Sequence, residues 1–177
     1  LAGLYAAGEC ACVSINGANR LGSNSLVEIL VFGARAGRHA AAFAKEHGQV
    51  NTAALEAQAK DERERIRKNF LTKMDGKERI ATIRTEMNTT METGAGIYRQ
   101  EGPLQDTCNK LAELKERFKN LTIDDRSNCF NTELTTALEL ENMLGIAEAV
   151  AHSAVNRKES RGSHQRSDFP KRDDEKF

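Results

Sequence analysis

The fold is decided by residues 104–121, LQDTCNKLAELKERFKNL, in which apolar side chains recur at helical spacing. Three apolar residues are spaced seven apart: Leu104, Leu111 and Phe118. Two further leucines, Leu114 and Leu121, follow members of this series by three residues. Residues three, four and seven apart share one face of an α-helix, so the pattern is typical of a helix with a coiled-coil-like seam. Pro103 suits the first turn, where a missing backbone N–H does no harm. The stretch predicts a helix that packs against other helices.

Similar patterns flank this stretch on both sides. An upstream stripe at spacings of three and four comprises Ile80, Ile83, Met87 and Met91. Residues 94–96, Gly-Ala-Gly, are expected to end that helix. A later helix is expected to begin after Asn131 or Thr132. Its apolar face comprises Leu140, Met143, Leu144, Ala147, Val150, Ala151 and Ala154. These patterns predict several antiparallel helices packed as a bundle.

The composition gives no sign of three kinds of partner: nucleic acid, the membrane and metal ions. Lys and Arg total 26, as do Asp and Glu, so no net charge draws the chain to nucleic acid or to an anionic membrane. The longest apolar segment, residues 26–43, is interrupted by charges, so we expect no direct membrane insertion. The four cysteines and four histidines lack metal-ligand spacing, which predicts no metal site.

The first 48 residues differ from the rest in pattern. Residues 4–7, Leu-Tyr-Ala-Ala, are apolar and bounded by glycines, which predicts a brief buried strand. A polar loop follows, and Ser25 with Glu28 forms the S-x-x-E pattern of a capping box at the start of a largely buried helix. Gly48 is expected to end that helix, because glycine is favoured just past a helix C-terminus. We place a domain boundary close to Gly48, where the composition becomes strongly charged.

The residues of this first segment with chemical potential are a carboxylate, a guanidinium and a helix start. Glu9 follows the predicted strand, and its carboxylate can accept hydrogen bonds from ribose or ribityl hydroxyls. Arg20 ends the small-residue loop Gly-Ala-Asn-Arg, and its guanidinium can hold a carboxylate in bidentate fashion. Ser23-Asn24-Ser25-Leu26 opens the helix, whose free N–H groups favour negative charge. Taken alone, a structural ion pair and plain helix capping explain the same residues.

Two motifs in order carry a family resemblance. Residues 3–37, GLYAAGECACVSINGANRLGSNSLVEILVFGARAG, closely resemble the segment of succinate dehydrogenase and fumarate reductase flavoproteins that completes the FAD-binding domain. Residues 159–164, ESRGSH, and 168–174, DFPKRDD, are similar to the stretch that leads out of the same family's helical domain. The resemblance implies a mainly α chain: the C-terminal edge of an α/β, Rossmann-like FAD-binding domain followed by an antiparallel helical bundle.

The resemblance also implies domain limits and site residues. The FAD-binding part would cover residues 1–48, the bundle residues 49–158, and a polar tail residues 159–177 that leads to a further C-terminal region. By the family's pattern, FAD is contacted by Glu9, Asn24, Ser25 and Leu26. Arg20 would bind a carboxylate of a C4 dicarboxylate substrate. Asn16 stands where the more familiar form of the motif has histidine, which puts in doubt any proton role there.

The activity implied is interconversion of succinate and fumarate by hydride transfer to or from flavin, coupled to quinone. The implied partners are an iron–sulfur subunit and membrane anchor subunits, on the cytoplasmic face of a bacterial inner membrane or the mitochondrial matrix side. The family's catalytic residues match no position of this chain. We therefore expect no catalytic residue in it and no activity from these 177 residues alone. Arg161 and His164 are expected to pack toward the flavin domain.

Two alternatives stay open at this point. L-aspartate oxidase shares the fold and a similar Gly-Ala-Asn-Arg loop, although residues 168–174 resemble the respiratory enzymes more closely. A free-standing helical interaction module without redox function is the second alternative, because residues 51–158 could fold as a bundle unaided. An apolar start at residues 1–7 argues against it, since an unpaired strand promotes aggregation.

Overall fold

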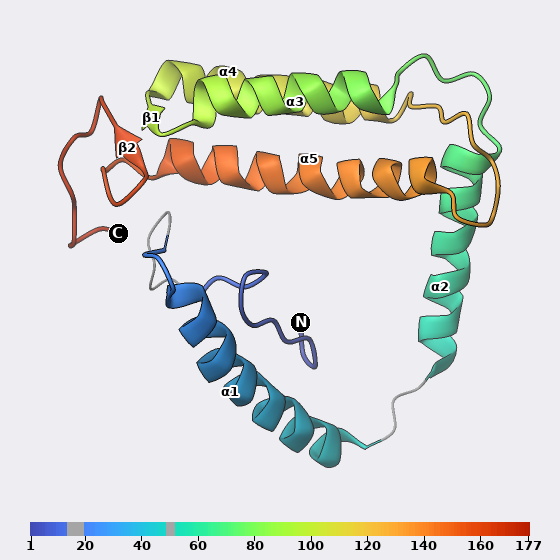
Figure 1. Ribbon diagram of the computed structural model, residues 1–177, viewed down its shortest axis with the longest axis horizontal. Coiled ribbons are helices and arrows are strands. Elements are labelled where there is room, and N and C mark those ends of the chain that lie inside the picture. The colour runs from blue at the N-terminus through green and yellow to red at the C-terminus, as the bar shows by residue number, and fades with distance from the viewer. Residues whose placement is uncertain (14–19, 49–51) are drawn as a thin grey trace. The chain divides into compact units, whose positions relative to one another are not determined.

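A computed structural model describes residues 1–13, 20–48 and 52–177, and the loop with Asn16 lies outside these ranges. The chain forms two compact units, Leu1–Glu56 and Ala57–Phe177. Along the chain (Figure 1) the elements are α1 Asn24–His47, α2 Thr52–Ile66, the π-helical turn η1 Arg67–Leu71, α3 Ile80–Ala95, β1 Tyr98–Arg99, α4 Glu101–Phe118, α5 Thr132–Asn156 and β2 Gln165–Arg166. The predicted mainly α fold is confirmed, while the domain limits at residues 48 and 158 stay predictions.

In the first unit, the N-terminal segment runs alongside α1 in the opposite direction. A Cβ at Gly3 would lie 3.2 Å from the Phe43 ring, near the end of the helix. The Tyr5 hydroxyl hydrogen-bonds His39 Nδ1 at 2.8 Å. A Cβ at Gly8 would lie 2.9 Å from Ile29, near the helix start. The segment therefore leads from the end of α1 toward its beginning.

Two predictions about strand structure and burial in this unit are wrong. Residues 4–7 form no strand and Leu4 is 72% exposed, because a strand needs a pairing partner and the described part of this unit supplies none. No residue of α1 is buried, because the short segment of residues 1–13 contacts it on one side only. Its exposed apolar side chains include Leu26, Val27, Ile29, Leu30 and Val31.

The two ends of α1 differ from each other. At its start, the predicted capping box is wrong: the helix begins at Asn24, so Ser25 lies inside the first turn. Ser23 occupies the N-cap position with φ 68° and makes no side-chain capping bond. At the other end Gly48 stops the helix as predicted, with φ 61° and its N–H donating to the Ala44 carbonyl. Glycine is favoured there because the left-handed conformation carries little strain without a Cβ.

The second unit is built on three long helices. Helices α3 and α5 run in one direction and α4 runs in the other, so helices consecutive in the bundle are antiparallel (Figure 1). Its buried hydrophobic core comprises Phe70, Ile83, Met87, Cys108, Leu111, Leu114, Phe118, Leu121, Ile123, Ala137, Leu140, Leu144, Ala147 and Ala151. The predicted stripes of all three helices are confirmed, except that Val150 is 41% exposed at the edge of its stripe.

Helix α2 joins the bundle mainly through charge and through its final turns. None of its own residues is fully buried, but Phe70 in η1 is 3% exposed and its ring meets Phe118 edge-on. Arg65 donates to Glu62 on its own helix and to Glu141 on α5, at 2.8 and 2.9 Å. The charged segment before residue 66 is therefore a solvated helix tied to the bundle at its end.

Helices α3 and α4 approach closely at Gly94. A Cβ there would overlap Thr107 Oγ1 and lie 2.8 Å from the Pro103 carbonyl oxygen. Thr107 is fixed in this place because its hydroxyl donates to the same carbonyl at 2.8 Å. Beyond this contact, β1 pairs in parallel with β2, Tyr98 opposite Gln165 and Arg99 opposite Arg166, which closes this end of the bundle.

A matched pair of glycine substitutions tests this packing. Gly94→Ala is expected to lower the free energy of unfolding by about 1–3 kcal/mol, because the new methyl group forces α3 and α4 apart. Gly145→Ala, on an exposed face of α5 with nothing within 4 Å, is expected to raise it by about 0.5–1 kcal/mol through helix propensity. Urea unfolding of both variants measures the difference, and equal effects would contradict the close approach.

Candidate functional site

The predicted cofactor contacts lie around the beginning of α1. Gly8 is buried against Ile29, and the segment that carries it runs toward the helix start, so Glu9 emerges on the N-terminal half of α1. Asn24 and Ser25 lie only four to five residues before Ile29, which is about 7 Å along a helix axis. The N-terminal segment and the helix start therefore belong to one region of the unit.

The side chains of this region are largely open to solvent. Glu9, Arg20 and Asn24 are exposed, Ser25 is half-buried, and Leu26 is 65% exposed. Among the residues that the structure describes, no ion pair joins Glu9 to Arg20, so both charges are available for other partners. The structural ion pair considered from sequence is not formed. The binding roles of all five residues stay predictions.

The helix start itself favours an anionic group. The first turn of α1 contains no acidic residue, and Ser23 makes no capping bond from its side chain. Helix α5 begins differently, because the Asn131 side chain accepts from Leu134 N at 2.7 Å and Glu133 lies in the first turn. The positive end of the α1 dipole thus lacks the side-chain compensation that α5 has. Such a helix start can stabilise a bound negative charge.

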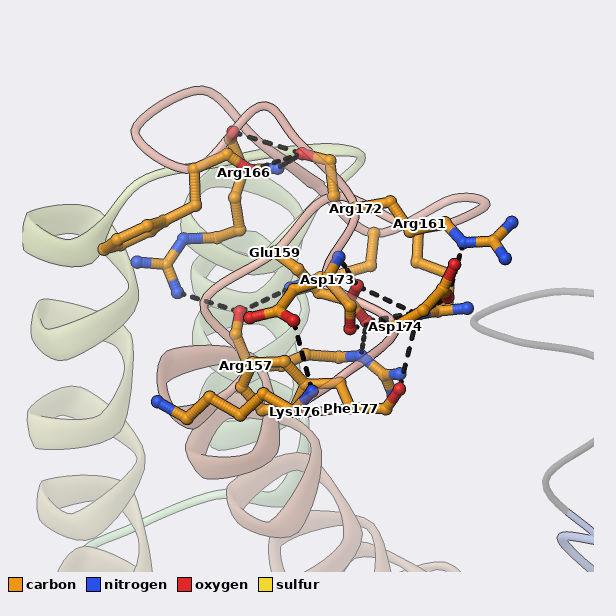
Figure 2. Close-up of polar contacts among 12 residues, drawn as sticks. Arg157, Glu159, Arg161, Arg166, Arg172, Asp173, Asp174, Lys176 and Phe177 are labelled. Carbon is orange, nitrogen blue, oxygen red and sulfur yellow. Dashed lines mark hydrogen bonds and ion pairs between the residues drawn. The ribbon is translucent and has the colours of Figure 1, made fainter.

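A second group of charged residues, here called the C-terminal polar cluster, lies where α5 ends (Figure 2). It consists of Arg99, Glu101, Arg157, Glu159, Arg161, His164, Arg166, Asp168, Asp173 and Asp174. Three of its members are fully buried, with Glu159 0%, Arg166 1% and His164 3% exposed. Among the described residues no buried side-chain nitrogen or oxygen lacks a hydrogen bond, so the cluster is internally satisfied.

Arg166 occupies the centre of the junction between helices and C-terminal segment. Its Nη1 donates to the carbonyls of Ala154 and Val155 at 2.9 and 3.0 Å, which satisfies the last turn of α5. Its Nη2 donates to Glu101 at the start of α4 at 2.7 Å, and its Nε to Asp168 at 2.8 Å. The guanidinium hydrogen bond holds the pKa of Asp168 well below its usual range. One buried cation therefore connects three segments.

Glu159 and its arginines form the neighbouring part of the cluster. Glu159 accepts from Arg161 Nε at 2.7 Å, from Arg157 Nε at 2.8 Å, and from the Asp173 N–H at 2.8 Å. The bond from Arg161 is the main reason that the pKa of Glu159 falls to about 2. Arg161 also donates to Asp174 at 2.8 Å. These bonds draw residues 173 and 174 back onto the segment that follows α5.

His164 has a defined tautomer in this cluster. Its Nδ1 lies 2.8 Å from Arg99 Nη1, and its Nε2 lies 2.9 Å from the Arg157 carbonyl oxygen. A guanidinium only donates, so Nδ1 accepts and Nε2–H donates, which requires the neutral imidazole. Burial lowers the pKa of His164, and the positive charges of Arg99, Arg166 and Arg157 lower it further.

The sequence interpretation missed this cluster. The sequence analysis treats residues 159–177 as a polar tail, whereas the structure buries Glu159, His164 and Arg166. They are buried because each is paired with an opposite charge or a backbone group. The available signal was the ESRGSH motif, but Arg99 and Glu101, far upstream, carry none. A contact of Arg161 or His164 with the flavin domain stays a prediction.

Other candidate chemistry is absent from the described ranges. Residues 1–13, 20–48 and 52–177 contain no group of His, Cys, Asp and Glu that could hold a metal ion. None of the cysteines in these ranges, at positions 10, 12, 108 and 129, forms a disulfide bond. No helix in these ranges is long and apolar enough to span a membrane.

Comparisons with known proteins match both ends of the chain. Residues 84–177 match the family model for the fumarate reductase flavoprotein C-terminus, and residues 1–26 match an FAD binding domain. These matches define the class as FAD-containing flavoproteins. The chain belongs to the fumarate reductase and succinate dehydrogenase flavoprotein family.

Individual relatives give the extent of the similarity. The fumarate reductase flavoprotein subunit of Mycobacterium tuberculosis is 54% identical over 180 residues, covering 100% of this chain and 31% of the relative. A solved variant of E. coli quinol fumarate reductase is 51% identical with a TM-score of 0.90, covering 99% of this chain and 30% of the other. The Mycobacterium smegmatis Sdh1 complex is 38% identical with a TM-score of 0.84, covering 97% and 28%. The chain thus spans about a third of these relatives.

Removing the buried guanidinium tests the role of Arg166. Arg166→Met is expected to lower the free energy of unfolding by about 3 kcal/mol, because it removes the buried cation that donates to Glu101, Asp168 and two carbonyls. Arg172→Met is the matched control, since Arg172 forms an exposed ion pair with Asp174 and should change nothing measurable. Chemical unfolding compares the two, and similar losses would contradict the assignment.

The His164 contacts predict a pH dependence. Because the folded state holds this imidazole neutral, the unfolded state takes up its proton first as the pH falls. The stabilising contribution is therefore complete above the unfolded pKa of about 6.5 and is lost below it. His164→Gln keeps one acceptor and one donor without titrating. Urea midpoints at pH 7.5 and 5.5 should fall less for this variant than for the parent, and an equal fall would disprove the prediction.

Proposed function

We propose that this chain is the portion of an FAD-containing subunit that completes its flavin site and carries its helical domain. The full subunit would interconvert succinate and fumarate. The supporting observation is the match at both ends of the chain, to an FAD binding domain at residues 1–26 and to a fumarate reductase flavoprotein C-terminus at residues 84–177. Bound FAD would supply hydride acceptance and donation at its N5 position.

The residues at the beginning of α1 fit the polar parts of such a cofactor. The Glu9 carboxylate is exposed and can accept hydrogen bonds from flavin-side hydroxyls. Asn24, Ser25 and Leu26 form the first turn of a helix whose positive end carries no acidic residue. That helix start favours negative charge on the bound group. Arg20 is exposed beside this region, and its guanidinium would hold one carboxylate of a C4 dicarboxylate.

The rest of the activity depends on residues outside the chain. About 70% of the length of the relatives lies beyond it. The resemblance implies that the family's catalytic groups belong to that part of the subunit. We infer that the 177 residues alone are inactive and that the whole subunit works with an iron–sulfur subunit and membrane anchors. Relatives solved as quinol fumarate reductase and Sdh1 complexes support this assembly. Peripheral attachment to a membrane follows, on its cytoplasmic or matrix side.

Substitutions in the full-length subunit test the two roles. Arg20→Lys is expected to lower kcat/KM for succinate about 10- to 100-fold with FAD content unchanged, because a lysine cannot make the bidentate contact. Glu9→Gln is expected to lower FAD retention instead. Arg38→Lys, exposed on α1, is the matched control for Arg20.

The assays also separate the proposed function from its closest rival. Quinone-linked succinate oxidation is measured beside aspartate-dependent peroxide formation on the same preparation. Peroxide formation from aspartate without succinate oxidation would identify an L-aspartate oxidase and overturn the proposal. Loss of FAD from the Arg20→Lys subunit would contradict the division of roles between Arg20 and Glu9.

A further inference from the structure

Phe130 combines a strained backbone with a fully exposed aromatic ring. Its φ is 52°, in the left-handed region, and its side chain is 96% exposed. A bulky L-residue in this region is unfavourable because its Cβ crowds the backbone, whereas glycine and asparagine adopt it readily. Exposing the ring also forfeits the hydrophobic gain that aromatic residues make on burial. Local structure alone therefore does not explain a phenylalanine at this position.

The loop that carries Phe130 is held rigidly on both sides. Asn131 donates to the carbonyls of Asp125 and Ser127 at 2.9 and 3.0 Å, and Glu133 accepts from the N–H groups of Asp124 and Asp125 at 2.8 Å. The loop is also bound to η1 and the residues after it by the Arg126 guanidinium, which donates to three carbonyls. These bonds hold the backbone that carries the ring in one conformation.

Phe130 borders a hollow that carries no charge. The hollow measures about 430 Å³. Its lining comprises Ser127, Asn128, Phe130, Asn131, Thr132, Leu134 and Thr135. An exposed aromatic anchor with uncharged polar groups around it is the composition of an interface hot spot and its rim.

We propose that residues 124–131 form a docking loop whose Phe130 ring inserts into an apolar pocket on the part of the same subunit that lies outside this chain. The relatives are about three times as long as the chain, so most of the subunit is available as a tethered surface. Because that surface belongs to the same polypeptide, its effective concentration near the loop is higher than that of a surface on a separate subunit. The inference rests on the proposed function only in taking this chain to be part of the longer subunit.

Photo-crosslinking identifies the occupant of the loop. A benzophenone amino acid replaces Phe130 in the full-length subunit within its assembled complex, and crosslinked peptides are identified by mass spectrometry. The expected product joins position 130 to a peptide of the same subunit outside the 177 residues. The same probe at Ile146, 64% exposed on α5, is the control and should not label that peptide. Crosslinks to another subunit only, no crosslink, or equal labelling from both positions would each overturn the proposal.

Thermal unfolding separates docking from a local role. In this 177-residue chain, Phe130→Asn should raise Tm by about 2–4 °C, because asparagine tolerates the left-handed backbone. In the full-length subunit it should lower Tm, because the anchor is lost, while Phe130→Tyr should leave both values unchanged. A rise in both proteins, or a fall in the short chain, would refute docking. Neither measurement uses succinate or fumarate turnover, so a failed redox assay leaves this test intact.

Discussion

One buried positive charge holds together the end of the helical unit at which α5 ends and α4 begins. Arg166 is 1% exposed, and a guanidinium out of water is tolerated only when its donors are all engaged. The engaged groups are the last carbonyls of α5, the first carboxylate of α4 and Asp168 in the C-terminal segment. Each of these segments must therefore be in place before the cation can be buried, and each is then held by it.

The two units differ in how far their apolar helix residues are buried. In the second unit, α3, α4 and α5 bury their stripes against one another, and Ile83, Leu104 and Leu111 are 0% exposed. In the first unit, the first half of α1 also carries many apolar side chains, yet none of the helix's residues is buried. A helix with apolar residues on most of its sides is typical of a helix that is buried on most of its sides. Its open N-terminus and its apolar flanks both fit a helix inside a larger flavin domain.

Periodic burial is what the sequence reveals best. The stripes through Ile83, Leu111 and Leu140 repeat with the helical period, so α3, α4 and α5 and their packing faces were predictable. The prediction of a strand at residues 4–7 was wrong, because the described part of the chain offers this segment no pairing partner. The Arg99–His164 contact joins residues 65 apart and leaves no local pattern. For the candidate site, motifs predicted residues and roles, but the capping at Ser25 failed because the N-cap lies two residues earlier, at Ser23, and helix ends are hard to place from sequence.

The parallel pairing of β1 with β2 has a consequence for biosynthesis. Residues 98–99 pair with residues 165–166, so two whole helices are made between one strand and the other. A ribosome adds on the order of 5–20 residues per second, so this end of the bundle stays unlatched for several seconds after β1 emerges. Throughout that interval the carboxylate of Glu101 lacks its hydrogen bond from Arg166. A nascent chain that stalls before Arg166 would present an unfinished helix end to cellular proteases.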